Sequence, residues 1–183
     1  MPYDRNALIS LIKEFALEFG DFTLASGQQA SFYLDCRKVT LHPQGANLIA
    51  DGILELLGDE LPDAVGGMAI GADPITAAVI TRAGQQGKSL RGFIVRKESK
   101  AHGQGRDVEG PVKAGDTAII VEDTTTTGGS SLKAIDKAEA AGLRVQGVVS
   151  IVDRLAGAGD IFSQRGYKFQ SLLTIRDFGI EPE

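Results

Sequence analysis

The sequence has little with which to crosslink the chain or anchor it to a membrane. Only one of its 183 residues is a cysteine, Cys36, which excludes an internal disulfide and is typical of a reducing cytoplasm. No apolar run approaches the roughly 20 residues that span a membrane. The first residues lack the basic and then apolar order of a signal peptide. We therefore expect a cytoplasmic protein with no membrane partner.

An excess of basic residues is also missing. The chain carries 19 Lys and Arg against 24 Asp and Glu, a formal net charge of -5, which argues against a broad nucleic-acid-binding face. The length suits one domain with a sizeable core, and no repeat, low-complexity tract or linker divides it. The 23 glycines predict many turns. We expect a single domain over residues 1–183.

Apolar spacing predicts strands that alternate with helices. Helices are expected over residues 8–19, closed by Gly20, from Pro43 to a stop at Gly58, and from Pro74 onward. Two extended pieces around a Ser26-Gly27 turn are expected within residues 22–37. Further strands are predicted over residues 64–70, 90–95, 118–121, 145–152 and 169–175. This alternation indicates an α/β fold, with a mostly parallel central sheet flanked by helices on both faces.

Residues 117–130 are the most informative stretch, because two adjacent acids and a glycine-rich turn follow a short apolar strand. The strand over residues 118–121 leads to Glu122 and Asp123, and a helix is expected to start near Ser130 or Ser131 as N-cap. Backbone N–H groups at the head of a helix cradle phosphates, and acids at a strand end accept from ribose hydroxyls. The arrangement suits a phosphorylated sugar. The alternative is that the two acids only cap the helix.

A second polar stretch, residues 96–110, is longer than the usual connection of about 4 to 6 residues. By composition it is typical of a solvated charged loop. Its cations, however, gather at one end, and its glycines would let it open and close over a ligand. The cations are Arg96, Lys97, Lys100 and His102, and the glycines are Gly103, Gly105 and Gly110. Such a loop suits a pyrophosphate leaving group, whose charge grows as its bond to the sugar breaks.

These stretches resemble a known family. A hydrophobic strand, two acids, small residues and Thr-Gly-Gly-Ser form a pattern similar to the phosphoribosyl-pyrophosphate motif of type I phosphoribosyltransferases. Arg-Lys-Glu-X-Lys-X-His-Gly, together with Phe-Thr-Leu-X-Ser-Gly near the N-terminus and Val-Asp-Arg after the next strand, resembles the orotate phosphoribosyltransferase family. The resemblance covers about residues 22–154.

The resemblance implies a type I phosphoribosyltransferase fold with a small N-terminal hood over about residues 1–40, and it assigns the site residue by residue. Lys100, Glu122 and Asp123 are the catalytic residues that it implies. Phosphoribosyl pyrophosphate would be bound by Arg96, Lys97, Lys100, His102, Glu122, Asp123, Thr124, Thr125, Thr126, Thr127, Gly128, Gly129 and Ser130. Thr126 and Arg154 would contact orotate.

Arg154 has its own physical rationale, because a guanidinium fork fits the carboxylate that orotate has and uracil lacks. An isolated Asp153-Arg154 at a strand end is more often a surface ion pair. The sequence also departs from a common family pattern, since lysines of many members are replaced by Ala25 and by residues 71–74. The backbone N–H groups of Gly71 and Ala72 are candidates for binding pyrophosphate there. An N-cap at Asp73 before Pro74 explains that segment equally well.

The implied activity is transfer of the 5-phosphoribosyl group from phosphoribosyl pyrophosphate to orotate, giving orotidine 5′-phosphate and pyrophosphate. Mg²⁺ would be held chiefly by substrate oxygens and waters, with no direct protein ligand expected. The family resemblance implies a homodimer whose loop reaches into the neighbouring subunit's site. A purine phosphoribosyltransferase would lack Arg154 and the cationic loop. A non-catalytic regulator that binds phosphoribosyl pyrophosphate on nucleic acid would be expected to show a basic face.

Overall fold

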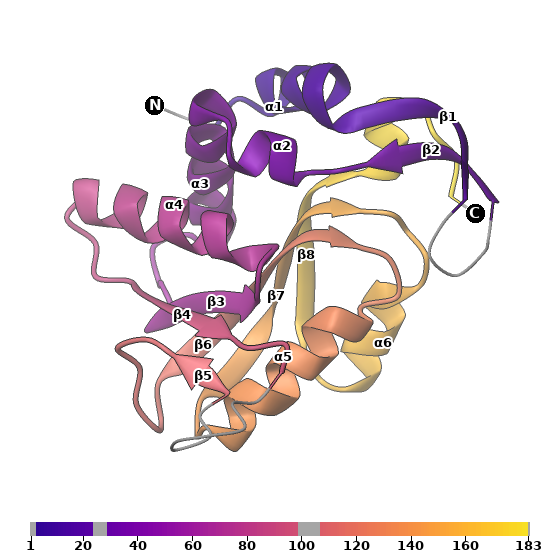
Figure 1. Cartoon of the computed structure of the whole chain (residues 1–183). Helices are drawn as coiled ribbons and strands as arrows, with labels where there is room; N and C mark the ends of the chain where they lie inside the picture. Colours follow the sequence, from indigo (N-terminus) through magenta and orange to yellow (C-terminus); the bar gives the residue numbers. More distant parts are fainter. Residues whose placement is uncertain (1–2, 24–28, 99–106, 183) are drawn as a thin grey trace.

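In its computed structural model, which describes residues 3–23, 29–98 and 107–182, the chain is organised around a six-stranded sheet (Figure 1). The strand order is β5-β4-β3-β6-β7-β8. Five strands run parallel: β3 (Ala64–Met68), β4 (Arg91–Val95), β6 (Thr117–Thr125), β7 (Arg144–Asp153) and β8 (Lys168–Thr174). The edge strand β5 (Val108–Glu109), which the sequence did not indicate, pairs antiparallel with β4. The predicted mostly parallel sheet is confirmed.

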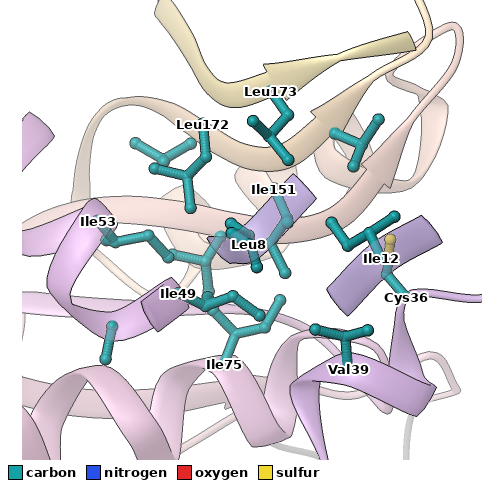
Figure 2. Packing of buried hydrophobic residues seen from close by; sticks show 14 of the residues in the cluster. Leu8, Ile12, Cys36, Val39, Ile49, Ile53, Ile75, Ile151, Leu172 and Leu173 are labelled. Carbon is teal, nitrogen blue, oxygen red and sulfur yellow. The ribbon is translucent and has the colours of Figure 1, made fainter. Parts of the chain in front are cut away.

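Helices cover both faces of this sheet (Figure 1). On one face lie α1 (Arg5–Leu11), α3 (Pro43–Leu57) and α4 (Ala72–Gln85), and on the other α5 (Gly129–Ala140) and α6 (Ala158–Gln164). Side chains of α1 and α3, among them Leu8, Ile49 and Ile53, pack against Ile151 and the β8 leucines (Figure 2). The predicted covering of both faces is therefore confirmed.

Strand β6 shows why the central strands consist of consecutive apolar residues in the sequence. Its alternate residues point to opposite faces, so Ile119 and Val121 join the core under α3 and α4, whereas Ala118 and Ile120 join the core under α5 and α6. All four are buried. A strand between two helical layers has no polar face, as is usual in parallel sheets.

The predicted helix over residues 8–19 is helical only to residue 16, and the prediction is wrong for its last three residues. The α-helix ends at Leu11, a π-helical turn spans Ile12–Ala16, and β1 (Leu17–Thr23) begins directly afterwards. Strand β1 pairs antiparallel with β2 (Gln29–Leu34), with Leu17 opposite Leu34. This pairing with a later segment overrides the local helical spacing, and it leaves Phe19 69% exposed. The predicted Ser26-Gly27 turn lies outside the described residues.

Other boundaries mostly follow the predictions. Helix α3 begins at Pro43, and Gly58 ends it with a φ of 70°. Strand β3, predicted to run to residue 70, ends two residues earlier, and Gly71 rather than Asp73 is the N-cap residue of α4, so the predicted Asp73 cap is wrong. The short elements α2 (Arg37–Thr40), α6 and the 3-10 turn Ile175–Phe178 were not predicted. None of the helices in the described ranges is long and apolar enough to cross a membrane.

Candidate active site

The sequence had indicated that Glu122 and Asp123 lie beyond the end of the strand. Strand β6 instead extends through Thr125, so both acids lie inside it. The extension follows from continued pairing with β7, in which Glu122 lies opposite Ser150 and Thr125 opposite Asp153. The two acids are therefore held by the central sheet. A rigid element of this kind fixes carboxylate positions better than a loop does.

Helix α5 begins without a side-chain cap. Its N-cap residue is Gly128, in the left-handed region with a φ of 80°, and a Cβ there would lie 2.7 Å from the ring of Phe162. The expected N-caps Ser130 and Ser131 lie instead within the first turn, so that prediction is wrong. Glu122 contacts the first turn of α5 through the Ser131 hydroxyl and not as a capping acceptor of a backbone N–H. The first-turn N–H groups of α5 are left for a ligand, and a helix N-terminus favours an anion.

Burial governs the charge state of the acid pair. The Glu122 carboxylate is 7% exposed and accepts a hydrogen bond of 3.0 Å from the Ser131 hydroxyl. Burial, together with the nearby negative charge of Asp123, raises the pKa of Glu122 from 4.5 to about 7. Burial likewise raises the pKa of Asp123, whose Oδ1 accepts a 2.7 Å hydrogen bond from the Thr124 N–H. Burial therefore disfavours full ionisation of both acids.

This burial predicts that Glu122→Gln makes the free protein more stable at pH 8 than the wild type. Because the folded-state pKa of Glu122 is raised from 4.5 to about 7, the folded chain holds a proton that the unfolded chain loses between these values, and wild-type stability falls as pH rises through that window. We expect the gain to be on the order of 2 kcal/mol at pH 8 and to vanish near pH 4. Urea unfolding at both pH values measures it.

The exposed Glu14→Gln is the matched control for this titration, and it should show no comparable pH-dependent gain. A Glu122→Gln variant whose stability relative to the wild type is the same at pH 4 and pH 8 would contradict the buried, protonated state of Glu122.

Two adjoining cavities open beside the acid pair. The first, here called the acid cavity, has a volume of about 330 Å³, and the second, here called the threonine cavity, about 190 Å³. The acid cavity is lined by Tyr33, Leu34, Asp35, Arg37, Met68, Ala69, Ile70, Gly71, Glu122, Asp123, Thr124 and Ser130. The threonine cavity is lined by Glu122, Thr124, Thr125, Thr126, Thr127, Gly128, Gly129, Ser130 and Ser131. A larger hollow of about 570 Å³ near β5 and α5 is lined by none of the predicted site residues.

The N-terminal strands are tied to this edge of the sheet by two side-chain contacts. The Thr124 hydroxyl lies 3.4 Å from Cys36 Sγ, to which it donates, and the Arg154 guanidinium lies 4.7 Å from the centre of the Phe32 ring. Burial raises the pKa of Cys36 to about 12, so the thiol stays neutral. It therefore serves as a packing and hydrogen-bonding partner of the strand and not as a nucleophile.

Arg154 is brought to the same edge by an unusual backbone turn. Its N–H donates to the Thr125 carbonyl at 2.9 Å, and the next residue, Leu155, has a φ of 58°, a costly conformation for a non-glycine residue. Asp153 accepts from the Leu155 N–H at 2.8 Å. Within the described ranges no carboxylate lies within ion-pair distance of Arg154. The alternative of a surface Asp153-Arg154 ion pair is wrong, and the guanidinium is available to a ligand.

The remaining predicted residues are less closely assembled. Gly71 lines the acid cavity so near Asp123 that a Cβ would come within 3.3 Å of its carboxylate, whereas Ala72 is buried at the start of α4. Arg96 is ion-paired with Glu109 at 3.0 Å, and Lys97 is exposed. Lys100 and His102 lie outside the described residues.

Sequence reasoning missed three residues around the acids: Arg37, Cys36 and Ser131. Arg37 could have been noticed as the second charge of Asp35-Cys36-Arg37, which directly follows an apolar stretch. Cys36 and Ser131 carry no local signal, because their hydrogen-bond partners lie 88 and 9 residues away along the chain.

The donor atoms of the site are suited to Mg²⁺ only in combination with a ligand. Across the described ranges no three His, Cys, Asp or Glu side chains gather into a set that could hold a metal ion. Glu122, Asp123 and the threonine hydroxyls offer oxygen donors, the kind that Mg²⁺ prefers, and this ion usually keeps waters and takes phosphate oxygens. The residues therefore fit a metal that arrives with a phosphorylated substrate.

The curated relatives of this chain are orotate phosphoribosyltransferases that match it over nearly its full length. No protein-family model matches the chain. Orotate phosphoribosyltransferase of Rhodopirellula baltica is 54% identical over 185 residues, covering 98% of this chain and 96% of the relative, and that of Corynebacterium glutamicum strain R is 42% identical over 176 residues, covering 96% and 94%. Both cover nearly the whole of each chain.

Solved structures agree with these sequence relatives. The Mycobacterium tuberculosis H37Rv orotate phosphoribosyltransferase in complex with Fe(III) dicitrate aligns with a TM-score of 0.86 at 37% identity, covering 96% of this chain and 99% of that one. The same enzyme in complex with 5-phospho-alpha-D-ribosyl 1-diphosphate aligns with a TM-score of 0.82 at 33% identity, over 96% and 99%. Adenine phosphoribosyltransferase of Leishmania donovani, at 17% identity and a TM-score of 0.66, shares the fold.

Proposed function

The chain belongs to the orotate phosphoribosyltransferase family, and from this we propose that the acid and threonine cavities are where it binds its two substrates. The enzyme transfers the phosphoribosyl group of phosphoribosyl pyrophosphate to orotate and so forms orotidine 5′-phosphate in pyrimidine biosynthesis. The observation that carries the assignment of the site is the position of the two acids near the carboxyl end of β6, where Glu122 lines both cavities and Asp123 lines the acid cavity.

The sugar phosphate is assigned to the threonine cavity. The uncapped first turn of α5 supplies N–H groups and a favourable dipole for the 5′-phosphate, and the exposed Thr126 and Thr127 add hydroxyl donors. Glu122 and Asp123 then accept from the ribose hydroxyls. A buried acid with a raised pKa is well suited to this contact, because the hydroxyl donors stabilise the ionised carboxylate that burial disfavours.

Orotate is assigned to the adjacent hood side, between Thr126 and Arg154. The Arg154 guanidinium is held over Phe32 and has no described carboxylate partner, which supports a role in binding the orotate carboxylate. The hood, about residues 1–40, would then close the site from above β6 and β7. We treat it as part of one domain over residues 1–183, since the apolar core under α3 joins Leu8 and Ile12 to Ile151 and Leu173.

Catalysis is proposed to act by positioning and by stabilising charge. Displacement at C1′ through an oxocarbenium-like state leaves pyrophosphate with growing negative charge. Arg96, Lys97, Lys100 and His102 would bind that charge, with the N–H groups of Gly71 and Ala72 beside it. Members of this family generally use Mg²⁺, which would neutralise part of the pyrophosphate charge while the chain itself holds the ribose.

Two further assignments complete the proposal. The protein would act as a homodimer in which Lys100 serves the partner's acid pair, since an isologous contact can share a loop between two sites. It would work in the cytoplasm, where its one buried thiol stays reduced. Nothing in the net charge of -5 favours a nucleic-acid partner.

Loss of orotate absorbance in the presence of phosphoribosyl pyrophosphate and Mg²⁺ tests the function directly, and Asp123→Asn tests the site. We expect the wild type to consume orotate and the variant to lose roughly ten- to hundredfold in kcat/KM for phosphoribosyl pyrophosphate, because an amide accepts more weakly from ribose hydroxyls. Its Tm should stay near or slightly above that of the wild type at pH 8, since the burial that raises the pKa of Asp123 makes its charge unfavourable in the free protein.

The exposed Asp59→Asn is the control with the same chemical change, and it should leave activity intact. A large loss of stability in Asp123→Asn without a change in substrate kinetics would give Asp123 a structural role instead.

A further inference from the structure

Arg37 is a cation in the wall of the acid cavity that no step described above uses. We infer that Arg37 binds the pyrophosphate group of phosphoribosyl pyrophosphate, an inference that rests on the proposed function. It would supply positive charge on the side of the site where residues 71–74 have no lysine.

The contacts of Arg37 hold its guanidinium in one orientation. Its Nε donates to Asp35 Oδ1 at 2.8 Å and its Nη2 to Asp35 Oδ2 at 3.1 Å, a two-point pair that fixes one edge of the group. Within the described ranges no acceptor lies within hydrogen-bond distance of Nη1. The side chain is 47% exposed, so this pair contributes little to stability. A second planar edge is therefore left for an anion.

The charge balance of the acid cavity supports an anion-binding role. Three carboxylates line it, those of Asp35, Glu122 and Asp123, and Arg37 is the sole Lys or Arg among the described residues of its lining. A pyrophosphate ester brought beside these carboxylates would be repelled unless cations offset them. Arg37 already acts on this pair, since its positive charge lowers the pKa of Asp123 against the larger effect of burial.

The position of Arg37 favours pyrophosphate over the orotate carboxylate. Arg37 shares the acid cavity with Gly71 and Asp123, which lie at the end of β3 and in β6, whereas Arg154 lies over Phe32 and is absent from that lining. The hydrogen bond between Thr124 and Cys36, the residue before Arg37, fixes this segment against β6. Arg37 therefore lines the same cavity as the two acids, on a segment that is held against β6.

The test compares Arg37→Ala and Arg37→Lys with the wild type by steady-state kinetics and by product inhibition. We expect Arg37→Ala to raise the KM for phosphoribosyl pyrophosphate and the inhibition constant of inorganic pyrophosphate by about tenfold or more, while the KM for orotate changes less than about twofold. The inhibition constant of ribose 5-phosphate, which lacks the pyrophosphate, should not change. Both constants of Arg37→Lys should lie between those of the wild type and of Arg37→Ala, because lysine keeps the positive charge but lacks the planar guanidinium.

Arg165→Ala is a matched control, since this arginine is 44% exposed, pairs with Asp136 at 2.8 Å and lines neither cavity. The inference would be overturned if Arg37→Ala, with an unchanged Tm, kept the wild-type KM for phosphoribosyl pyrophosphate and the wild-type inhibition constant of pyrophosphate. A rise in the KM for orotate alone would also overturn it. If Arg37→Ala does not fold, Arg37→Lys decides by the same constants. If wild type and Arg165→Ala both fail to consume orotate, the proposed function fails; if they consume it and Arg37 variants behave as wild type, only this inference fails.

Discussion

Replacing Arg154 by alanine is expected to raise the KM for orotate roughly 10- to 100-fold, the loss typical of a hydrogen bond to a charged group. The reason is that the orotate carboxylate loses a guanidinium already held in place over Phe32 by its ring and by the backbone contact to Thr125. The KM for phosphoribosyl pyrophosphate should change far less. Initial rates at varied concentrations of each substrate separate the two constants.

Two controls distinguish a loss of orotate binding in Arg154→Ala from a general packing effect. Arg154→Lys retains a cation but not the two-point fork, so we expect an intermediate KM for orotate. The exposed Arg176→Ala should leave both constants unchanged. If the orotate KM of a folded Arg154→Ala protein equals that of the wild type, Arg154 does not bind orotate.

Mixing two inactive variants, Lys100→Ala and Asp123→Ala, is expected to restore about a quarter of wild-type activity if each site is shared between subunits. The Lys100→Ala chain keeps its acids and takes the lysine of its partner, so each mixed dimer regains one intact site. Random pairing makes half of the dimers mixed, and half of the sites in those dimers are intact. The orotate absorbance assay measures the recovery after subunit exchange.

The mixing experiment has an internal control. Glu122→Ala mixed with Asp123→Ala should restore nothing, because both acids belong to the same strand of one chain and every site lacks one of them. Differently tagged subunits confirm the exchange. No recovery in the Lys100→Ala and Asp123→Ala mixture, with exchange confirmed, would reject the shared site and leave Lys100 acting within its own chain.

The sequence alone predicted the parts of this protein that depend on neighbours along the chain. The apolar runs that became β3, β4, β6, β7 and β8 were found because burial between two helical layers needs several consecutive apolar residues. Glu122, Asp123 and the following threonines and glycines could be predicted as a phosphate-binding stretch because a phosphate is bound by successive backbone groups of one turn. The family resemblance is the basis for assigning roles to Arg154 and to the cations around Lys100.

Tertiary structure decided where elements end and which residues complete the site. The helical spacing continues to residue 19, yet the helix ends at Ala16 and Leu17 pairs with Leu34 in β2; a contact between separate segments leaves no periodic trace in either. Pairing of Thr124 with Val152 carries β6 past its predicted end, and the Phe162 ring beside Gly128 fixes the start of α5. The positions of Cys36 and Arg37 beside the acids likewise depend on packing between segments that are far apart in the sequence. Local sequence therefore carried the residue types of the proposed ligand-binding stretch, whereas long-range packing determined the burial of its acids.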